Sequence, residues 1–156
     1  MSDGNYKINR NPFTWNGILG RIDFLLANIV IFIFYITPLV LFCSNAYHQV
    51  QESIIPADSP DGIAFLTLTF IYHYCVFCLF KKRILDAFSP LVFRKSDDKK
   101  LKLKENLFAG VIAFLYALFS IRSIFMLVYP IEAWFWNIVI VVLLVLKGQH
   151  TSKKDN

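Results

Sequence analysis

Four long apolar stretches constrain the fold of this chain more than any other feature of its sequence. A transmembrane helix needs roughly 20 mostly apolar residues to cross a hydrocarbon core about 30 Å thick. At about 1.5 Å per residue, the four stretches would measure from about 24 to 33 Å as helices. They are residues 22–43, 62–80, 107–128 and 131–146. The sequence therefore predicts an all-α integral membrane protein, with a bundle of four transmembrane helices over residues 22–148.

The composition agrees with a membrane protein. A soluble domain normally contains about 45 to 50% apolar and about 25% charged residues. The 156 residues here are 56% apolar and 17% charged, and the mean hydropathy is +0.52. A chain of this length has too little core to hide that excess from water, so a bilayer is expected to cover it. The fourth stretch is short, and we expect Lys147 to snorkel and the bilayer to thin there.

The positive charges are sorted along the chain in a way that predicts its orientation. Fifteen of the 16 Lys and Arg residues fall in the N-terminal segment 1–21, between the second and third stretches, or after the fourth. The connections 44–61 and 129–132 contain neither residue type. Basic residues resist translocation across the membrane. We therefore expect the N-terminal segment, the loop 81–104 and the polar tail 149–156 to be cytoplasmic, with both termini inside.

The overall basicity, with a pI near 9.2, does not indicate nucleic acid as a partner. Membrane topology already explains where the positive charge lies. The loop 81–104 is a candidate for anionic lipid head groups, at roughly 1 kcal/mol per basic residue near the surface. Phe13 and Trp15, just before the first stretch, are expected at the membrane interface, where aromatic side chains are enriched.

The third stretch carries a small-residue face. Ala109, Ala113 and Ala117 recur at four-residue intervals, so they lie on one side of a helix. Small residues at this spacing let two helix backbones approach closely in lipid. The face predicts a packing seam, either within the chain or between two copies of a homo-oligomer.

Two polar residues within the stretches are candidate intramembrane sites. Arg122 is the only basic residue inside one of them, so it should be paired, hydrated or snorkelling. We expect it to reach Glu132 or the acidic outer loop, with anion binding or substrate movement as the alternative. His73 lies near the middle of the second stretch and lacks a second metal ligand on its side of the membrane. An interhelical hydrogen bond is the favoured interpretation for it.

No pattern in the sequence predicts an enzyme, a cofactor or a metal site. Cys75 and Cys78 form a CxxC motif, but a single such motif inside an apolar helix favours buried small side chains over redox chemistry or zinc. There is no glycine-rich phosphate loop, and no Ser-His-Asp set falls on one side of the membrane.

Three short runs are similar to the landmarks of a known family. The first enters the first helix and comprises Trp15, Gly17, Leu19, Gly20, Arg21, Asp23 and Phe24, with Ile18 where the family has Arg. The second comprises Arg83, Ile84, Leu85 and Asp86, without the family's His, and with Phe88 near the position of its Gly. The third comprises Leu146, Lys147 and Gly148. Together they resemble the domain-of-unknown-function 805 family, small four-span inner-membrane proteins of bacteria.

The resemblance directs attention to four charged residues at the cytoplasmic interface, Arg21, Asp23, Arg83 and Asp86. We expect Arg21 to pair with Asp86 and Arg83 with Asp23, clamping the inner ends of the first two helices. The alternative is that each is a solvated charge flanking a helix. The pairing predicts that Asp86→Arg rescues Arg21→Asp.

The sequence predicts only a broad functional class. The chain is predicted to be a non-enzymatic binding or accessory protein of the bacterial inner membrane, with a membrane-protein partner or a second copy of itself. One alternative is an immunity or antiholin-like protein that binds a pore-forming toxin. The other is a transporter or channel subunit that uses Arg122 and His73.

Overall fold

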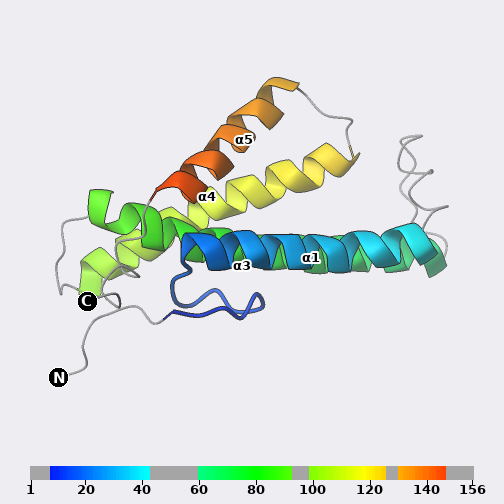
Figure 1. Ribbon diagram of the computed structural model, residues 1–156, viewed down its shortest axis with the longest axis horizontal. Coiled ribbons are helices and arrows are strands. Elements are labelled where there is room, and N and C mark those ends of the chain that lie inside the picture. The colour runs from blue at the N-terminus through cyan, green and yellow to red at the C-terminus, as the bar shows by residue number, and fades with distance from the viewer. Residues whose placement is uncertain (1–7, 43–59, 93–98, 126–129, 147–156) are drawn as a thin grey trace.

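The computed structural model describes residues 8–42, 60–92, 99–125 and 130–146. Four helices occupy most of them: α1 (Arg21–Phe42), α3 (Pro60–Val92), α4 (Lys99–Phe125) and α5 (Pro130–Val145) (Figure 1). The described residues contain no strand, only an isolated bridge between Ile8 and Ile18. The predicted all-helical class is therefore confirmed. Three helices, α1, α3 and α4, are long and apolar enough to cross a membrane, and α5 is a shorter apolar helix.

Two helices extend beyond their predicted limits. α3 continues past Phe80 to Val92, and α4 begins at Lys99 rather than at Leu107. Hydropathy marks a span as ending at the first cluster of charges, but Lys, Arg, Leu and Ala all favour helix. Most of the predicted loop 81–104 is therefore helical, and this correction changes the environment of its charges.

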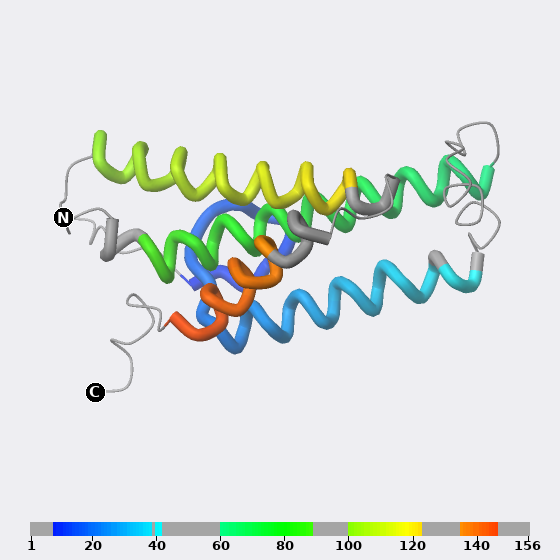
Figure 2. Tube along the Cα trace, turned by 90° about the horizontal axis from the view of Figure 1, so that it is seen from above, coloured from blue at the N-terminus to red at the C-terminus, as the bar shows by residue number. Residues whose placement is uncertain are grey.

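α3 is the central helix of the bundle. It packs against both α1 and α4, which lie on its two sides (Figure 2). Helix direction alternates, so the start of α1, the end of α3, the start of α4 and the end of α5 lie at one end of the bundle (Figure 1). We call this the basic end. α5 packs against α1 and α3, and it diverges from α4 toward the opposite end (Figure 1).

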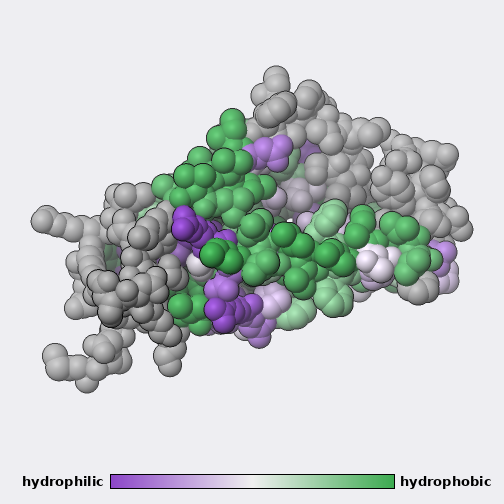
Figure 3. All heavy atoms as spheres, viewed as in Figure 1, coloured by the Kyte–Doolittle hydropathy of each residue, from purple (hydrophilic) through white to green (hydrophobic). Residues whose placement is uncertain are grey.

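The core lies where the helices meet near the basic end. Phe24 of α1 contacts Phe80 of α3 edge to face, with ring centroids 5.2 Å apart, and Phe80 stacks on Tyr116 of α4 at 3.9 Å. The outer faces of α1 and α4 are largely apolar and exposed. In Figure 3, hydrophilic side chains gather near the basic end, while hydrophobic ones cover most of the visible face of α1. The bundle therefore presents hydrocarbon-like surface along its length and polar surface mainly at its ends.

The alanine seam of α4 is buried within the chain. Ala109, Ala113 and Ala117 are 1%, 0% and 7% exposed, and Ala109 and Ala113 belong to the same core cluster as Leu79 and Phe80 of α3. The structure thus uses the predicted packing face for contact between α3 and α4. The adjacent Gly110 does not belong to the seam, because a Cβ atom built there would meet no heavy atom within 4 Å.

We expect Ala113→Leu to reduce the free energy of unfolding by about 1 to 3 kcal/mol, because the added atoms overpack a closed interface. Gly110→Ala, three residues away on the same helix, should be neutral or stabilise by up to about 1 kcal/mol. Unfolding in mixed detergent micelles measures both. Equal effects of the two variants would show that the seam does not pack against α3.

Candidate functional site at the basic end of α3

Residues 8–20 fold into a loop that lies against the helices at the basic end. Asn9 organises the loop, because its side-chain amide donates to Thr14 Oγ1 at 2.8 Å and to the carbonyl oxygen of Asn16 at 2.9 Å. Its backbone N–H donates to Ile18 O at 3.0 Å, which closes the loop. Gly17 adopts a φ of 99°, in the left-handed region that favours glycine. We call residues 8–20 the N-terminal loop.

The N-terminal loop encloses the ammonium group of Lys82. Lys82 Nζ donates to the carbonyl oxygens of Asn9, at 3.2 Å, and of Asn11, and it lies 3.4 Å from Thr14 Oγ1. The Lys82 side chain is fully buried. A buried ammonium is costly unless its three donors find acceptors, and the loop supplies three oxygens. Lys82 therefore joins the N-terminal loop to α3.

Two further contacts hold the tip of the loop against α3. Lys81 Nζ lies 5.4 Å from the centroid of the Trp15 ring, a distance typical of a cation–π contact. About two turns of α3 toward the opposite end, the Tyr74 hydroxyl donates to Phe13 O at 3.2 Å. Phe13 and Trp15 remain more than half exposed. The loop thus presents two aromatic side chains outward, as expected at a membrane interface.

Arg83, the next residue on α3, binds the end of α5. Arg83 Nε donates to Leu143 O at 2.8 Å, and Nη2 donates to Leu146 O. The last four carbonyl groups of a helix have no partner within the helix, and this end of the helix dipole attracts cations. The Arg83 guanidinium therefore caps α5 from a neighbouring helix.

Asp86 completes this arrangement. Its Oδ2 accepts from Arg83 Nη1 at 2.6 Å, and neither side chain is exposed to solvent. One turn of helix separates the two residues, so α3 itself brings them together. The ion pair compensates a charge that would otherwise be costly to bury. Lys82 and Arg83 are adjacent on α3, and the N-terminal loop and α5 lie on opposite sides of that helix (Figure 1).

No family model, curated protein or solved structure matches the chain. The resemblance to the domain-of-unknown-function 805 family therefore stays a prediction. We infer the role of the basic end from the contacts of its own residues.

The predicted ion pairs between α1 and α3 are wrong. Asp23 pairs instead with Arg10 of the N-terminal loop, with Oδ1 3.0 Å from Nε, and Arg83 pairs with Asp86 on its own helix. Arg21 is exposed, and it lies close enough to Arg83 for the two guanidinium groups to repel one another. The sequence located the right residues at one end of the bundle but not their partners. Arg83 and Asp86 are also not solvated flanking charges, because helix α3 carries them into the core.

A second polar group lies deeper in the bundle and links three helices. His73 Nδ1 lies 2.6 Å from the carbonyl oxygen of Thr69, and Nε2 lies 3.1 Å from Ser120 Oγ on α4. Because a carbonyl can only accept, Nδ1 carries the proton, and Nε2 of the neutral ring accepts from Ser120. Thr69 Oγ1 is 3.2 Å from the Tyr35 hydroxyl on α1. The structure therefore contains the interhelical hydrogen bond expected of His73.

A double-mutant cycle with His73→Leu and Ser120→Ala should give a coupling energy of about 0.6 kcal/mol, rising to roughly 2 kcal/mol if the bond is well shielded. The free energy of unfolding in mixed micelles provides the measurement. Strictly additive effects of the two substitutions would mean that the bond contributes nothing to the association of α3 with α4.

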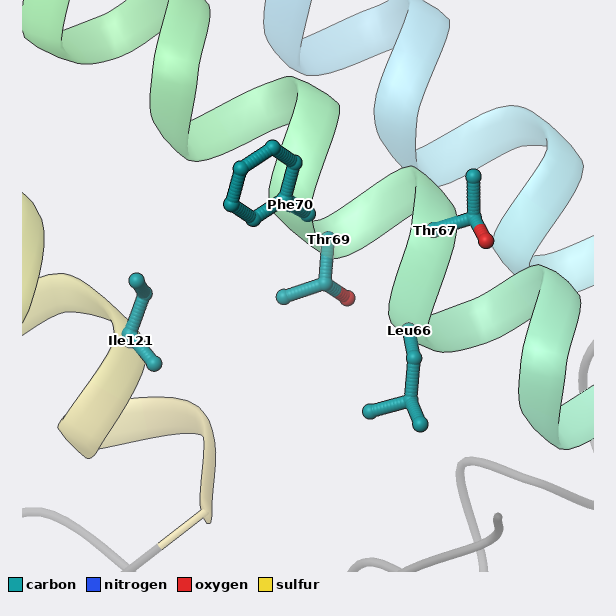
Figure 4. Close-up of a pocket in the computed structure, with 5 residues that line it drawn as sticks. All are labelled: Leu66, Thr67, Thr69, Phe70 and Ile121. Carbon is teal, nitrogen blue, oxygen red and sulfur yellow. The ribbon is translucent and has the colours of Figure 1, made fainter.

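The region beside this group is apolar. A recess of about 490 Å³ lies between α3 and α4, with Ile121 facing Leu66, Thr69 and Phe70 across it (Figure 4). Its two hydroxyl groups are already engaged, Thr69 with Tyr35 and Thr67 with Ile63 O at 2.8 Å. Among the described residues that line the recess, both hydroxyl groups therefore already have a partner within the protein.

The remaining candidates lie apart from the basic end. Arg122 is exposed near the far end of α4. The side chain of Glu132 and the outer loop, its predicted partners, lie outside the described residues, so that prediction stays open. Cys75 and Cys78 are buried, 3% and 0% exposed, as expected for small apolar residues. Within the described ranges, no three His, Cys, Asp or Glu side chains gather as a metal site would require.

Sequence reasoning missed the N-terminal loop and the capping of α5. Asn9, Asn11 and Asn16 are residue types that favour turns, and Gly17 permits the positive φ, so a folded loop could have been predicted from them. Nothing in the sequence indicated that Arg83 would meet Leu143, because that contact depends on where α5 ends in space.

Proposed function

We propose that this chain is a multi-span protein of the bacterial inner membrane that acts as a non-enzymatic binding or accessory component. One observation carries the proposal. The outward faces of α1 and α4 are apolar and exposed along their length, whereas cations at the basic end of α3 are buried among protein oxygens. Apolar patches of this extent are rare on soluble proteins. In a bilayer the same faces meet lipid tails and need no further cover.

The sorting of charge supports four crossings with the basic end in the cytoplasm. Lys and Arg residues of short loops remain on the cytoplasmic side, and the alternation of helix direction is compatible with an even number of crossings. α5, with 16 residues, is about 24 Å long and needs local thinning of the bilayer. The resemblance to the domain-of-unknown-function 805 family supports the same topology and the bacterial location.

The internal contacts favour an accessory component over a transporter. A permeation path needs polar groups that face an open channel. In this bundle His73 of α3 bonds to Ser120 of α4, and Thr69 of α3 bonds to Tyr35 of α1. Such bonds hold helices together and leave the outward faces as the surface available to other molecules.

Membrane extraction followed by photo-crosslinking tests the proposal. The chain should stay in the pellet after alkaline carbonate treatment, because its helices are held by hydrocarbon rather than by charge. A photoreactive amino acid at Leu115, 52% exposed on α4, should capture a specific membrane protein, with Ile33 on α1 as the matched position on the other face. Release into the supernatant would refute membrane integration. Capture of lipid alone at both positions would refute the accessory role.

A further inference from the structure

An apolar groove begins where the tip of the N-terminal loop ends. It has a volume of about 360 Å³, and Pro12 and Phe13 form its border on the loop side. Val30 and Phe34 of α1 form one wall, and Ile71 and Cys75 of α3 form the other. Cys75 and Val30 are its residues nearest the basic end on their helices, so the groove runs from the loop tip toward the middle of the bundle.

The groove differs from the rest of the apolar surface because the loop tip closes one end of it, and charged side chains lie beyond that end, toward the start of α1. The bond from Tyr74 to Phe13 O fixes the loop tip over α3. Arg10, two residues before Pro12, has a side chain that is 75% exposed. Its ion-pair partner Asp23 is 28% exposed, and Lys81 lies over the Trp15 ring of the same loop. Two cations, Arg10 and Lys81, and one acid, Asp23, therefore lie around the loop, which gives this region a net positive charge.

From this juxtaposition we infer that the groove holds one acyl chain of an anionic phospholipid, whose phosphate lies against Arg10 at the loop. The inference rests on the proposed membrane location. A tail gains no hydrophobic free energy by moving from bilayer to groove, so selection comes from two other sources. These are close packing against the groove walls and the attraction of a phosphate head group to basic residues near the surface. Phe13 and Trp15 mark the depth at which head group and tail meet.

Native mass spectrometry of the purified full chain, titrated with phosphatidylglycerol or with phosphatidylethanolamine of the same acyl composition, tests the inference. One phosphatidylglycerol molecule should bind saturably and about fivefold or more tightly than phosphatidylethanolamine, because each basic residue near the surface contributes about that factor. Arg10→Gln should remove most of this preference, and Arg10→Lys should retain it.

A second pair of variants tests the groove itself. Val30→Trp fills the groove, whereas Val111→Trp places the same side chain on the lipid-facing side of α4, and the two valines are 49% and 51% exposed. We expect Val30→Trp to weaken phosphatidylglycerol binding about threefold or more, through lost tail packing, and Val111→Trp to leave it unchanged. Circular dichroism and size-exclusion profiles establish that both variants fold.

Two outcomes would overturn the inference. Equal binding of the two lipids would exclude an anionic head-group site, and equal effects of Val30→Trp and Val111→Trp would exclude the groove. Neither outcome bears on membrane integration, because carbonate extraction reports that independently. Binding of free fatty acid in place of phosphatidylglycerol at equal affinity would also contradict the assignment of a phosphate to Arg10.

Discussion

Arg83→Met should lower the free energy of unfolding by about 3 to 5 kcal/mol, the largest single-residue effect we expect in this chain. The substitution leaves the buried Asp86 carboxylate without its cation, and breaking a buried pair on one side costs about that amount. It also removes the donors that cap Leu143 and Leu146 at the end of α5. The measurement is unfolding in mixed micelles, with hydrogen exchange in the last turn of α5 as the local readout.

Two control variants distinguish the loss of these specific contacts from general destabilisation of the fold. The double variant Arg83→Met with Asp86→Leu should recover part of the loss, because the uncompensated charge is then gone while the cap on α5 is still missing. Arg10→Met breaks the exposed pair with Asp23 and should cost less than about 1 kcal/mol. If Arg83→Met proved as mild as Arg10→Met, the buried contacts of Arg83 with Asp86 and with the end of α5 would not exist.

Lys82→Met should release the N-terminal loop while leaving the helices in place. The carbonyl oxygens of Asn9 and Asn11 lose their donor, and hydrogen bonds to a charged group contribute about 1.5 to 3 kcal/mol. Amide exchange at Asn9, whose N–H is bonded to Ile18 O, should accelerate, and protease should cleave the loop sooner. Lys82→Arg should give an intermediate result, because the planar guanidinium cannot match the pocket of three oxygens.

Lys104→Met serves as the control for lost charge, since Lys104 is an exposed lysine near the same end on α4. It should change neither exchange nor proteolysis. The two adjacent cations of α3 should also act separately. Lys82→Met should leave the end of α5 protected, and Arg83→Met should leave the loop protected. Loosening of both regions by either variant would mean that the loop and α5 form one unit.

The sequence predicted those parts of the fold that depend on local pattern. Apolar stretches and small-residue spacing are properties of consecutive residues, so the four helices and the seam at Ala109, Ala113 and Ala117 could be anticipated. His73 could be assigned an interhelical hydrogen bond because a neutral polar group in an apolar helix has few other ways to be satisfied.

The charges at the basic end could not be predicted in the same way. The hydropathy pattern predicts that the second helix ends before Lys82 and Arg83, because hydropathy treats every cation as exposed to water. Their burial depends on partners distant in sequence, namely the carbonyl groups of the N-terminal loop and of the end of α5. Arg10 was overlooked as a partner of Asp23 for the same reason. Ion pairs depend on tertiary geometry. The predicted pair of Arg21 with Asp86 assumed that the ends of α1 and α3 face each other directly, without the N-terminal loop between them.

The most direct test of four crossings with a cytoplasmic basic end is the side on which single cysteines react. In a variant lacking Cys43, Cys75 and Cys78, cysteines placed at Ser2, Ser53, Ser96 and Ser152 are exposed to a membrane-impermeant maleimide in spheroplasts of a bacterial host before and after lysis. The account predicts reaction at Ser53 in intact spheroplasts and at the other three positions only after lysis. Reaction of Ser152 in intact spheroplasts would place the end of α5 outside, and would contradict a bundle in which Arg83 holds that end beside α3.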